Sequence, residues 1–228
     1  MEIQPIAHIH TDFKEKFGIP RQSGLVEALQ ASIIFAPPYR VPDAVRGLED
    51  FSHIWLLWEF SQARRENWSP TVRPPRLGGN KRLGVFATRS PFRPNALGLS
   101  VVRLLSVTPD TPKGPVLQVS GADLLDGTPI YDIKPYLPYA DAHPEASGGF
   151  TDQVARRQLE VECPEEILSR VPEEKRPALL GVLAQDPRPS YQSDPARVYG
   201  MAFAGAEVKF SVNGEILTVQ EILPLGRG

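Results

Sequence analysis

The chain has 228 residues, of which 41% are hydrophobic and 23% are charged, and this composition is typical of a soluble globular protein of one or two domains. A net charge of −2 argues against a protein that coats nucleic acid by bulk charge. The single cysteine, Cys163, excludes an internal disulfide and fits a reducing cytoplasm, and no apolar run has the length of a signal-peptide core or a membrane helix.

The first 60 residues predict short strands separated by stiff loops. Residues 3–9 alternate in polarity and predict a strand, and residues 32–35 predict another. Residues 43–48 predict one helical turn with Asp43 as its N-cap. The apolar, aromatic run at 51–60 predicts a central strand buried on both faces.

Residues 84–100, GVFATRSPFRPNALGLS, predict a strand at 84–87, a polar loop and a second strand at 98–105. Arg89 and Arg93 flank Phe92 between two prolines, so the loop is stiff and presents two planar cations and a ring. Such a loop suits a carboxylate, a phosphate or a nucleobase. The alternative is a rigid surface loop whose arginines are merely solvated.

Positive charge is concentrated around this loop. Between Glu66 and Asp110 there is no acidic residue, and the local charge is +7. Its basic residues are Arg73, Arg76, Lys81, Arg82, Arg89, Arg93 and Arg103. A basic block in a neutral protein indicates a surface that faces a polyanion, unless acids elsewhere in the fold pair with it.

Strands are predicted again at 115–120 and 130–134, with a turn signal, DGTP, at 126–129. Asp132 and Lys134 lie two residues apart on one strand, so their side chains point the same way. They form either a functional polar cluster or a structural ion pair. Many short strands with little helical periodicity favour a closed or nearly closed β-structure.

The composition changes near residue 150. Helices are predicted at 164–171 and 173–183, followed by strands at 199–203 and 206–219, the latter folded over Asn213-Gly214 as a type I′ turn. We therefore predict a mainly β protein with a barrel domain at 1–150 and a small α+β domain at 151–228.

Two classes of site have no support in the sequence. No G-x-G-x-x-G opens a helix after a strand and no P-loop is present, so neither a Rossmann cofactor fold nor an NTPase is indicated. The four histidines do not stand at metal-ligand spacing with cysteines, and we predict no metal site. His8 and His10 are expected to be a surface pair, and His53 a core histidine.

Several long blocks together resemble the TrmO (TsaA-like, YaeB-type) tRNA methyltransferases over almost the whole chain. These blocks are PRQxG at 20–24, DAVRGL at 43–48, RPPRLGGN at 73–80, GVFATRSPFRPN at 84–95, DGTP at 126–129, DIKPYLP at 132–138 and DPRPxY at 186–191. Ala96-Leu97 and Ser61-Gln62 depart from the pattern, where relatives more often have Pro-Ile and His-Gln.

The resemblance implies a single-sheeted β-barrel that uses S-adenosylmethionine to methylate N6 of threonylcarbamoyladenosine beside the tRNA anticodon, and a homodimer. It implies cofactor contacts from Pro20, Arg21, Gln22, Ser61, Gln62, Phe86, Arg89, Arg93, Asp126, Gly127, Thr128 and Pro129. Phe92 is an alternative to Phe86 as the ring beside adenine. The methyl donor has a carboxylate, which an arginine can bind, and ribose hydroxyls, which an acid can bind, so these residue types suit the donor.

The nitrogen that accepts the methyl group is N6 of threonylcarbamoyladenosine, which is also part of a urea group. It is a weak nucleophile, and its proton must be taken up as the new bond forms. Asp132 or Tyr136 is the candidate base or orienting group, and Lys134 is the candidate that polarises the urea oxygen. RNA contacts are expected from Arg76, Lys81, Arg82, Arg188 and Tyr191.

Alternatives remain for the function and for the second domain. A non-catalytic RNA-binding protein of the same fold would bind RNA without needing the cofactor, and a methyltransferase for another small substrate would not need the C-terminal domain. The loop at 186–191 either stacks on an unpaired base or forms a rigid interdomain corner. If the loop stacks on a base, truncation near residue 150 is expected to leave cofactor binding largely intact.

Overall fold

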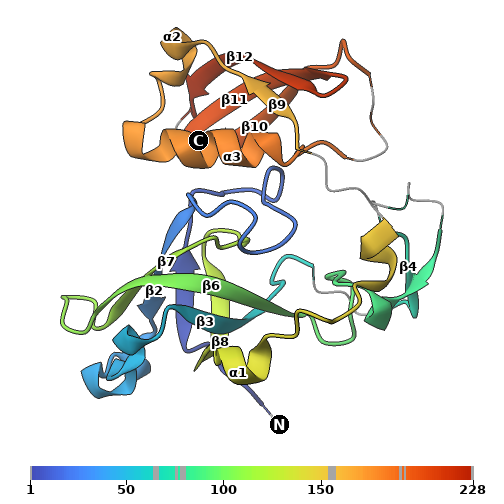
Figure 1. Ribbon diagram of the computed structural model, residues 1–228. Helices are drawn as coiled ribbons and strands as arrows, with labels where there is room; N and C mark the ends of the chain where they lie inside the picture. Colours follow the sequence, from blue (N-terminus) through green and yellow to red (C-terminus); the bar gives the residue numbers. More distant parts are fainter. Residues whose placement is uncertain are drawn as a thin grey trace.

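The computed structural model describes residues 2–63, 67–74, 77, 81–153, 158–189, 192 and 194–226. A closed barrel forms the N-terminal part, and a sheet with two short α-helices forms the C-terminal part (Figure 1). The barrel strands are β1 (Ala7–His10), β2 (Gln30–Phe35), β3 (His53–Glu59), β6 (Leu97–Thr108), β7 (Val116–Ser120) and β8 (Thr128–Pro135). Their order around the barrel is β1-β2-β7-β6-β3-β8, and every pair is antiparallel.

Alternation of side chains fills the barrel interior. Strand β3 buries Ile54, Leu56 and Trp58. His53, Trp55 and Leu57 on its other face are only partly covered. The prediction that this strand is buried on both faces is therefore wrong, because a closed barrel has one interior face and leaves the other outside.

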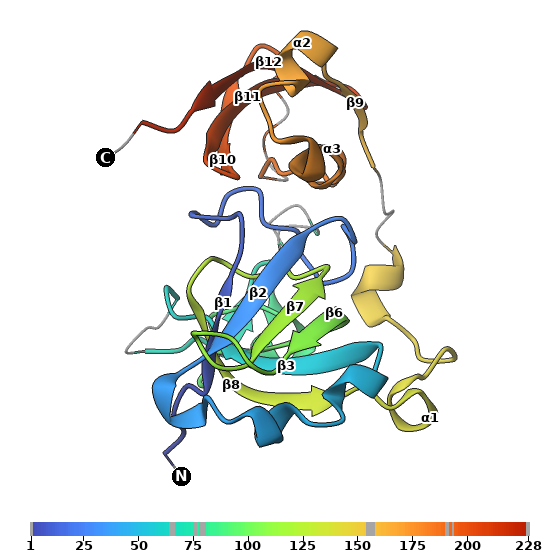
Figure 2. The ribbon, with the colours of Figure 1, turned by 90° about the vertical axis from the view of Figure 1, so that its left-hand side faces the viewer.

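Three connections gather at one end of the barrel. They are the β1–β2 loop at residues 11–29, the β3–β6 connection at 60–96 and the β7–β8 turn at 121–127. The C-terminal sheet lies over this end in Figures 1 and 2, and α1 (Pro138–Asp141) lies at the opposite end. The β3–β6 connection contains the small β4 (Thr71–Val72) and β5 (Leu83–Gly84) pair.

Two local predictions need correction. The strand predicted at 84–87 is a 3-10 turn, Val85–Ala87, which buries Val85 and leaves the Phe86 ring 71% exposed. The turn predicted at 43–48 is a 3-10 turn at Pro42–Val45, and its N-cap position is Val41, not Asp43. Further 3-10 turns lie at Pro37–Tyr39, Leu48–Asp50, Gly149–Gln153 and Glu173–Lys175.

The C-terminal part is a four-stranded sheet with two helices, and the predicted fold class, a mainly β protein with a barrel and a small α+β domain, is confirmed. The sheet order is β10-β11-β12-β9, in which only β9 pairs in parallel. Its elements are β9 (Glu160–Glu162), α2 (Glu165–Leu168), α3 (Arg176–Ala184), β10 (Tyr199–Phe203), β11 (Ala206–Asn213) and β12 (Ile216–Pro224).

Turn chemistry differs from the prediction in this sheet. The β11–β12 turn centres on Gly214 and Glu215 with a positive φ only at Gly214, which is the type II′ pattern. The type I′ pattern occurs instead between β10 and β11, where Ala204 and Gly205 have φ of 48° and 79°.

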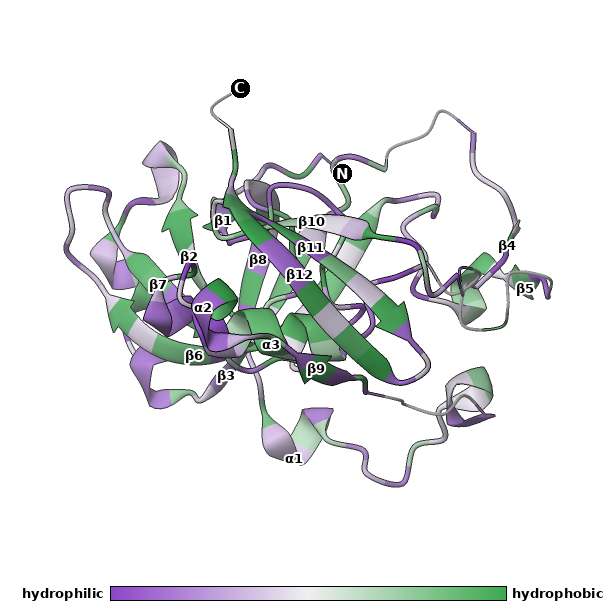
Figure 3. Ribbon diagram, turned by 90° about the horizontal axis from the view of Figure 1, so that it is seen from above, coloured by the Kyte–Doolittle hydropathy of each residue, from purple (hydrophilic) through white to green (hydrophobic). Residues whose placement is uncertain are grey.

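The core of the C-terminal part includes residues from the barrel's β1–β2 loop. Phe13, Val26 and Leu29 are 1%, 5% and 4% exposed and belong to the same apolar cluster as α3 and β10–β12. Helix α3, mostly hydrophobic in Figure 3, lies between the sheet and this loop. A Cβ at Gly181 would stand 2.7 Å from Val26 Cγ1, so glycine permits the close approach.

Polar contacts strengthen the same junction. Lys175 Nζ lies 2.6 Å from Asp12 Oδ2, and the Ala202 amide donates to Glu15 Oε1 at 3.0 Å. The domain division near residue 150 stays a prediction, and the β1–β2 loop packs against both parts. Over the described ranges, no helix combines the length and apolarity needed to cross a membrane.

Candidate active site

The β1–β2 loop forms one wall of the candidate site at the barrel rim. The Gly24 amide donates to Gly121 O at 2.8 Å, and the Asp126 amide donates to Phe13 O at 2.8 Å. These bonds clamp the loop onto the β7–β8 turn, because both partners are backbone groups that need pairing away from water. The segment Pro20–Gln22 is thereby held at the rim.

This wall contains a cation, Arg89, and a carboxylate, Asp123, whose pKa feels the charge of Arg89. Arg89 donates from its guanidinium to the side-chain oxygen of Gln22, and Gln22 donates to Arg21 O. Asp123 accepts from Ser100 Oγ at 2.7 Å, and Ser100 in turn accepts from Trp58 Nε1 at 3.0 Å. Burial raises the pKa of Asp123, although the Ser100 hydrogen bond and the charge of Arg89 act against it.

Asp126 is bound to the same loop. Its carboxylate accepts from the Thr11 amide at 3.0 Å and from Lys14 Nζ, and His10 Nδ1 lies 3.4 Å away. Partial burial raises the pKa of Asp126, but the Lys14 and Thr11 hydrogen bonds outweigh it, so the net pKa lies below the usual range. Its charge therefore fastens the loop in the free protein.

An aromatic and cationic shelf stands beside this wall. The Phe86 ring lies 6.1 Å from the Trp68 ring, and the Arg93 guanidinium carbon lies 5.8 Å from the Phe86 ring centre. Arg93 also donates to Thr88 O at 2.7 Å, which closes its own loop. A cavity of about 180 Å³ is lined by Phe86, Arg93, Pro94 and Asn95. Exposed rings next to an arginine are suited to stacking a nucleobase.

The other predicted cofactor residues lie at the same rim. Ser61 and Gln62 are exposed just after β3, and Lys16 Nζ donates to Gln62 O at 2.9 Å. Pro20 is buried and Arg21 exposed. Gly127, with φ 75°, and Thr128, 3% exposed, form the turn into β8, and Pro129 opposite His8 follows.

The predicted catalytic residues lie elsewhere on the barrel. Asp132 and Lys134 form an exposed ion pair of 3.0 Å on β8. The Tyr136 amide donates to His53 O at 3.0 Å, and the Tyr136 ring faces Trp55, where β3 begins. Tyr136 stands eight positions after Thr128, which is roughly 26 Å along a strand. Within one chain the structure does not bring Tyr136 to the rim, and the three catalytic roles stay predictions.

The residues predicted to contact RNA differ in their exposure and in whether the structure describes them. Lys81 and Arg82 are exposed beside the β4–β5 pair, whereas Arg76 and Tyr191 lie outside the described residues. Arg188 makes two bonds to the Asp186 carboxylate, at 2.8 and 2.9 Å, and its side chain is 12% exposed. The loop at 186–189 is thus folded upon itself, which favours the rigid-corner alternative for Arg188.

Sequence reasoning missed two acids, the half-buried Asp123 and the buried Glu59. Asp123 stands between Ala122 and Leu124, which are 3% and 1% exposed, and a lone acid in an apolar stretch was the available signal. Glu59 ends the apolar run of β3, is 6% exposed and accepts from the Tyr131 hydroxyl at 2.5 Å. Among the described residues, no group of three or more histidine, cysteine or acidic side chains is arranged to hold a metal ion.

The protein is thus a closed antiparallel barrel with acids, arginines and exposed aromatic rings at one rim, which makes that rim the candidate ligand site. Family models identify it further. Residues 8–142 match the tRNA-methyltransferase O N-terminal domain, and residues 156–225 match the TrmO C-terminal domain. The chain belongs to the TrmO family.

Individual relatives agree with this assignment. The chain is 45% identical over 197 residues to an Escherichia coli protein named tRNA (adenine(37)-N6)-methyltransferase, covering 84% of this chain and 83% of that one. It is 44% identical to a Pseudomonas aeruginosa protein named as a putative S-adenosylmethionine-dependent methyltransferase, with 87% of each chain covered. A crystal structure of TrmO from P. aeruginosa superposes with a TM-score of 0.79 at 36% identity, covering 98% of this chain and 97% of that one.

Proposed function

We propose that this protein methylates N6 of threonylcarbamoyladenosine in tRNA, using S-adenosylmethionine, and that it acts as a homodimer. The observation that carries the proposal is the wall formed by Gln22, Arg89 and Asp123 beside the shelf formed by Trp68, Phe86 and Arg93. The names of the relatives support tRNA methylation at an adenine N6. The threonylcarbamoyl specificity rests on the resemblance of the sequence blocks.

The rim residues fit the methyl donor by their chemistry. A guanidinium suits the donor's carboxylate, an acid suits its ribose hydroxyls, and an exposed ring suits its adenine. Arg89 and Asp123 supply the first two groups, and Phe86 supplies the ring. A cavity of about 180 Å³ is small for a whole nucleoside, so it would hold one end of the donor.

The donor, when bound, supplies an electrophilic methyl group. The protein's part is alignment, because in-line displacement depends on the approach of the acceptor nitrogen. Arg89 and Asp123 would orient the donor, and the aromatic shelf would keep water from one side of it. Because these residues lie away from the rim within one chain, Asp132 or Tyr136 of the second protomer of the proposed homodimer would take up the proton released from the acceptor nitrogen, and Lys134 of that protomer would polarise the urea oxygen.

The test uses labelled S-adenosylmethionine and tRNA that carries or lacks threonylcarbamoyladenosine, followed by nucleoside mass spectrometry. Label in threonylcarbamoyladenosine alone supports the proposal. Label in unmodified adenosine overturns the substrate specificity, and RNA binding with no label favours a non-catalytic protein. Asp132→Asn should lower turnover with unchanged cofactor affinity, since an amide does not accept a proton as a carboxylate does. Light scattering should give twice 25.2 kDa for a homodimer.

A further inference from the structure

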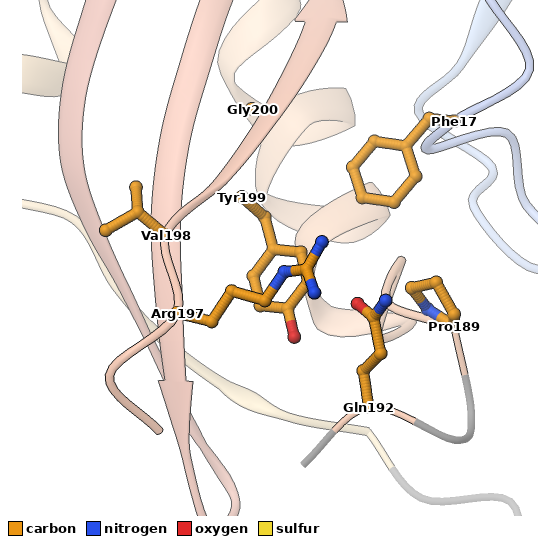
Figure 4. A pocket seen from close by; sticks show the side chains of 7 residues that line it. All are labelled: Phe17, Pro189, Gln192, Arg197, Val198, Tyr199 and Gly200. Atoms are coloured by element: carbon orange, nitrogen blue, oxygen red, sulfur yellow. The ribbon is translucent and has the colours of Figure 1, made fainter. Parts of the chain in front are cut away.

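A second pocket lies where the β1–β2 loop meets the C-terminal sheet, and none of its lining residues belongs to the wall of Gln22, Arg89 and Asp123 or to the aromatic shelf described above. Its volume is about 320 Å³, and Figure 4 shows the side chains that surround it. Phe17 comes from the barrel loop, and Arg197, Tyr199, Gln192 and Pro189 come from the C-terminal part. This volume is at the small end of ligand pockets, so it suits one planar ring rather than an extended ligand.

Tyr199 carries a hydroxyl with no hydrogen-bond partner among the described residues. The residue is 5% exposed, and its buried hydroxyl has no hydrogen-bond partner within the part of the chain that the structure describes. Buried hydroxyls are normally paired, because desolvation without a hydrogen bond is costly. A ligand atom beside the pocket wall would supply the hydrogen-bond partner that this hydroxyl lacks.

Arg197 forms no ion pair with an acid among the residues that the structure describes. Its guanidinium carbon lies 5.3 Å from the centre of the Tyr199 ring. The other described basic side chains of the C-terminal part all contact an acid or a backbone carbonyl. They are Arg170, Lys175, Arg176, Arg188 and Lys209. Among the described basic residues of this part, Arg197 alone pairs with neither an acid nor a backbone carbonyl, and one face of its guanidinium lies over the Tyr199 ring.

The ligand class follows from these groups. Phe17, whose ring is partly exposed, and the Arg197 plane can each stack on a flat ring, and the Gln192 amide and Tyr199 hydroxyl can bond to its edge. One such cation, among described basic side chains that otherwise contact acids or backbone carbonyls, does not make a phosphate groove. The combination fits an unpaired nucleobase.

We propose that this pocket binds one unpaired base of the RNA substrate, stacked between Phe17 and Arg197 and bonded at its edge by Tyr199; the proposal rests on the function proposed above. Phe17 stands three residues before Pro20, so one loop carries the pocket wall on one side and the candidate cofactor segment on the other. A base in this pocket would anchor the RNA next to the rim. The role predicted for Arg188 and Tyr191 would then belong to Arg197 and Tyr199.

The experiment measures affinity for a labelled anticodon stem-loop RNA carrying threonylcarbamoyladenosine, at one fixed salt concentration, together with calorimetry of S-adenosylmethionine and thermal unfolding. Arg197→Ala should weaken RNA binding by about 5- to 100-fold through lost stacking. Tyr199→Phe should weaken it by about 2- to 10-fold and keep or raise the unfolding temperature, since the free protein loses only an unpaired hydroxyl. Cofactor affinity should stay unchanged in both variants.

Arg46→Ala is the matched control, because it removes the same charge from an exposed pair with Asp43 at the opposite end of the barrel. It should bind RNA within about twofold of wild type. Wild-type RNA affinity in Arg197→Ala and Tyr199→Phe, in a protein that methylates tRNA, overturns the pocket but not the proposed function. A lowered unfolding temperature with unchanged RNA affinity in Tyr199→Phe also overturns it. A wild-type protein that binds the cofactor but no stem-loop RNA overturns both.

Discussion

Replacement of Phe13 by alanine tests whether the barrel loop belongs to the C-terminal core. The ring is 1% exposed and lies edge-on to Phe203, with centroids 5.5 Å apart. Loss of a fully buried ring leaves a cavity and costs about 3–5 kcal/mol. Phe86→Ala is the control, because that ring is 71% exposed and should change stability by less than about 1 kcal/mol.

The assay exploits the placement of the tryptophans. All three, Trp55, Trp58 and Trp68, are in the barrel part, so their fluorescence reports barrel unfolding, whereas far-ultraviolet circular dichroism reports both parts. If Phe13 joins the two parts, urea unfolding of Phe13→Ala should shift to lower urea by both probes. Affinity for S-adenosylmethionine should fall as well, since the same loop carries Pro20–Gln22. A cost below about 1 kcal/mol, or a shift seen by dichroism alone, would refute the coupling.

Three further variants test the rim and the barrel interior. Gly98→Ala places a Cβ 2.3 Å from the Trp58 ring and should cost about 1–3 kcal/mol in urea unfolding, unless the indole can move. Asp123 has a raised pKa in the folded protein, so ionising it lowers the stability of the fold as pH rises from 3.8 through that pKa. Asp123→Asn should therefore be more stable than wild type at pH 7 and equally stable below pH 3.8. The same variant should bind the cofactor more weakly. Asp126 has a lowered pKa and stabilises the fold above pH 3.8; Lys14→Ala should lose about 0.5–1 kcal/mol at pH 7, and this loss should vanish as acid protonates Asp126.

Local patterns predicted the barrel well and its contacts less well. Alternating residues such as Ala7 and Ile9 mark strands because the two-residue period shows directly in the sequence. Burial of Phe13 depends on residues nearly 190 positions away, and no local pattern carries that information. The Asn213-Gly214 signal misplaced the turn by one residue because strand register, set by pairing across the sheet, decides which residues stand at the corner.

In the candidate site too, residues in an unusual local pattern were predicted, whereas residues whose role depends on distant partners were missed. Arg89 and Arg93 were found because a stiff, basic loop between prolines is unusual in itself. Asp123 was missed because its importance comes from Ser100 and Arg89, which meet it only in the folded barrel. For Asp132 the sequence predicted the contact with Lys134, and the structure shows that contact as an exposed ion pair.

The shared β1–β2 loop also has a consequence for synthesis of the protein. Phe13, Val26 and Leu29 leave the ribosome early, but the strands that cover them end roughly 190 residues later. At bacterial-type rates of about 5–20 residues per second, these apolar side chains wait on the order of 10–40 s without their partners. The nascent barrel therefore exposes an apolar loop through most of translation. Chaperone binding to ribosome-bound chains should be strongest before β11 and β12 emerge.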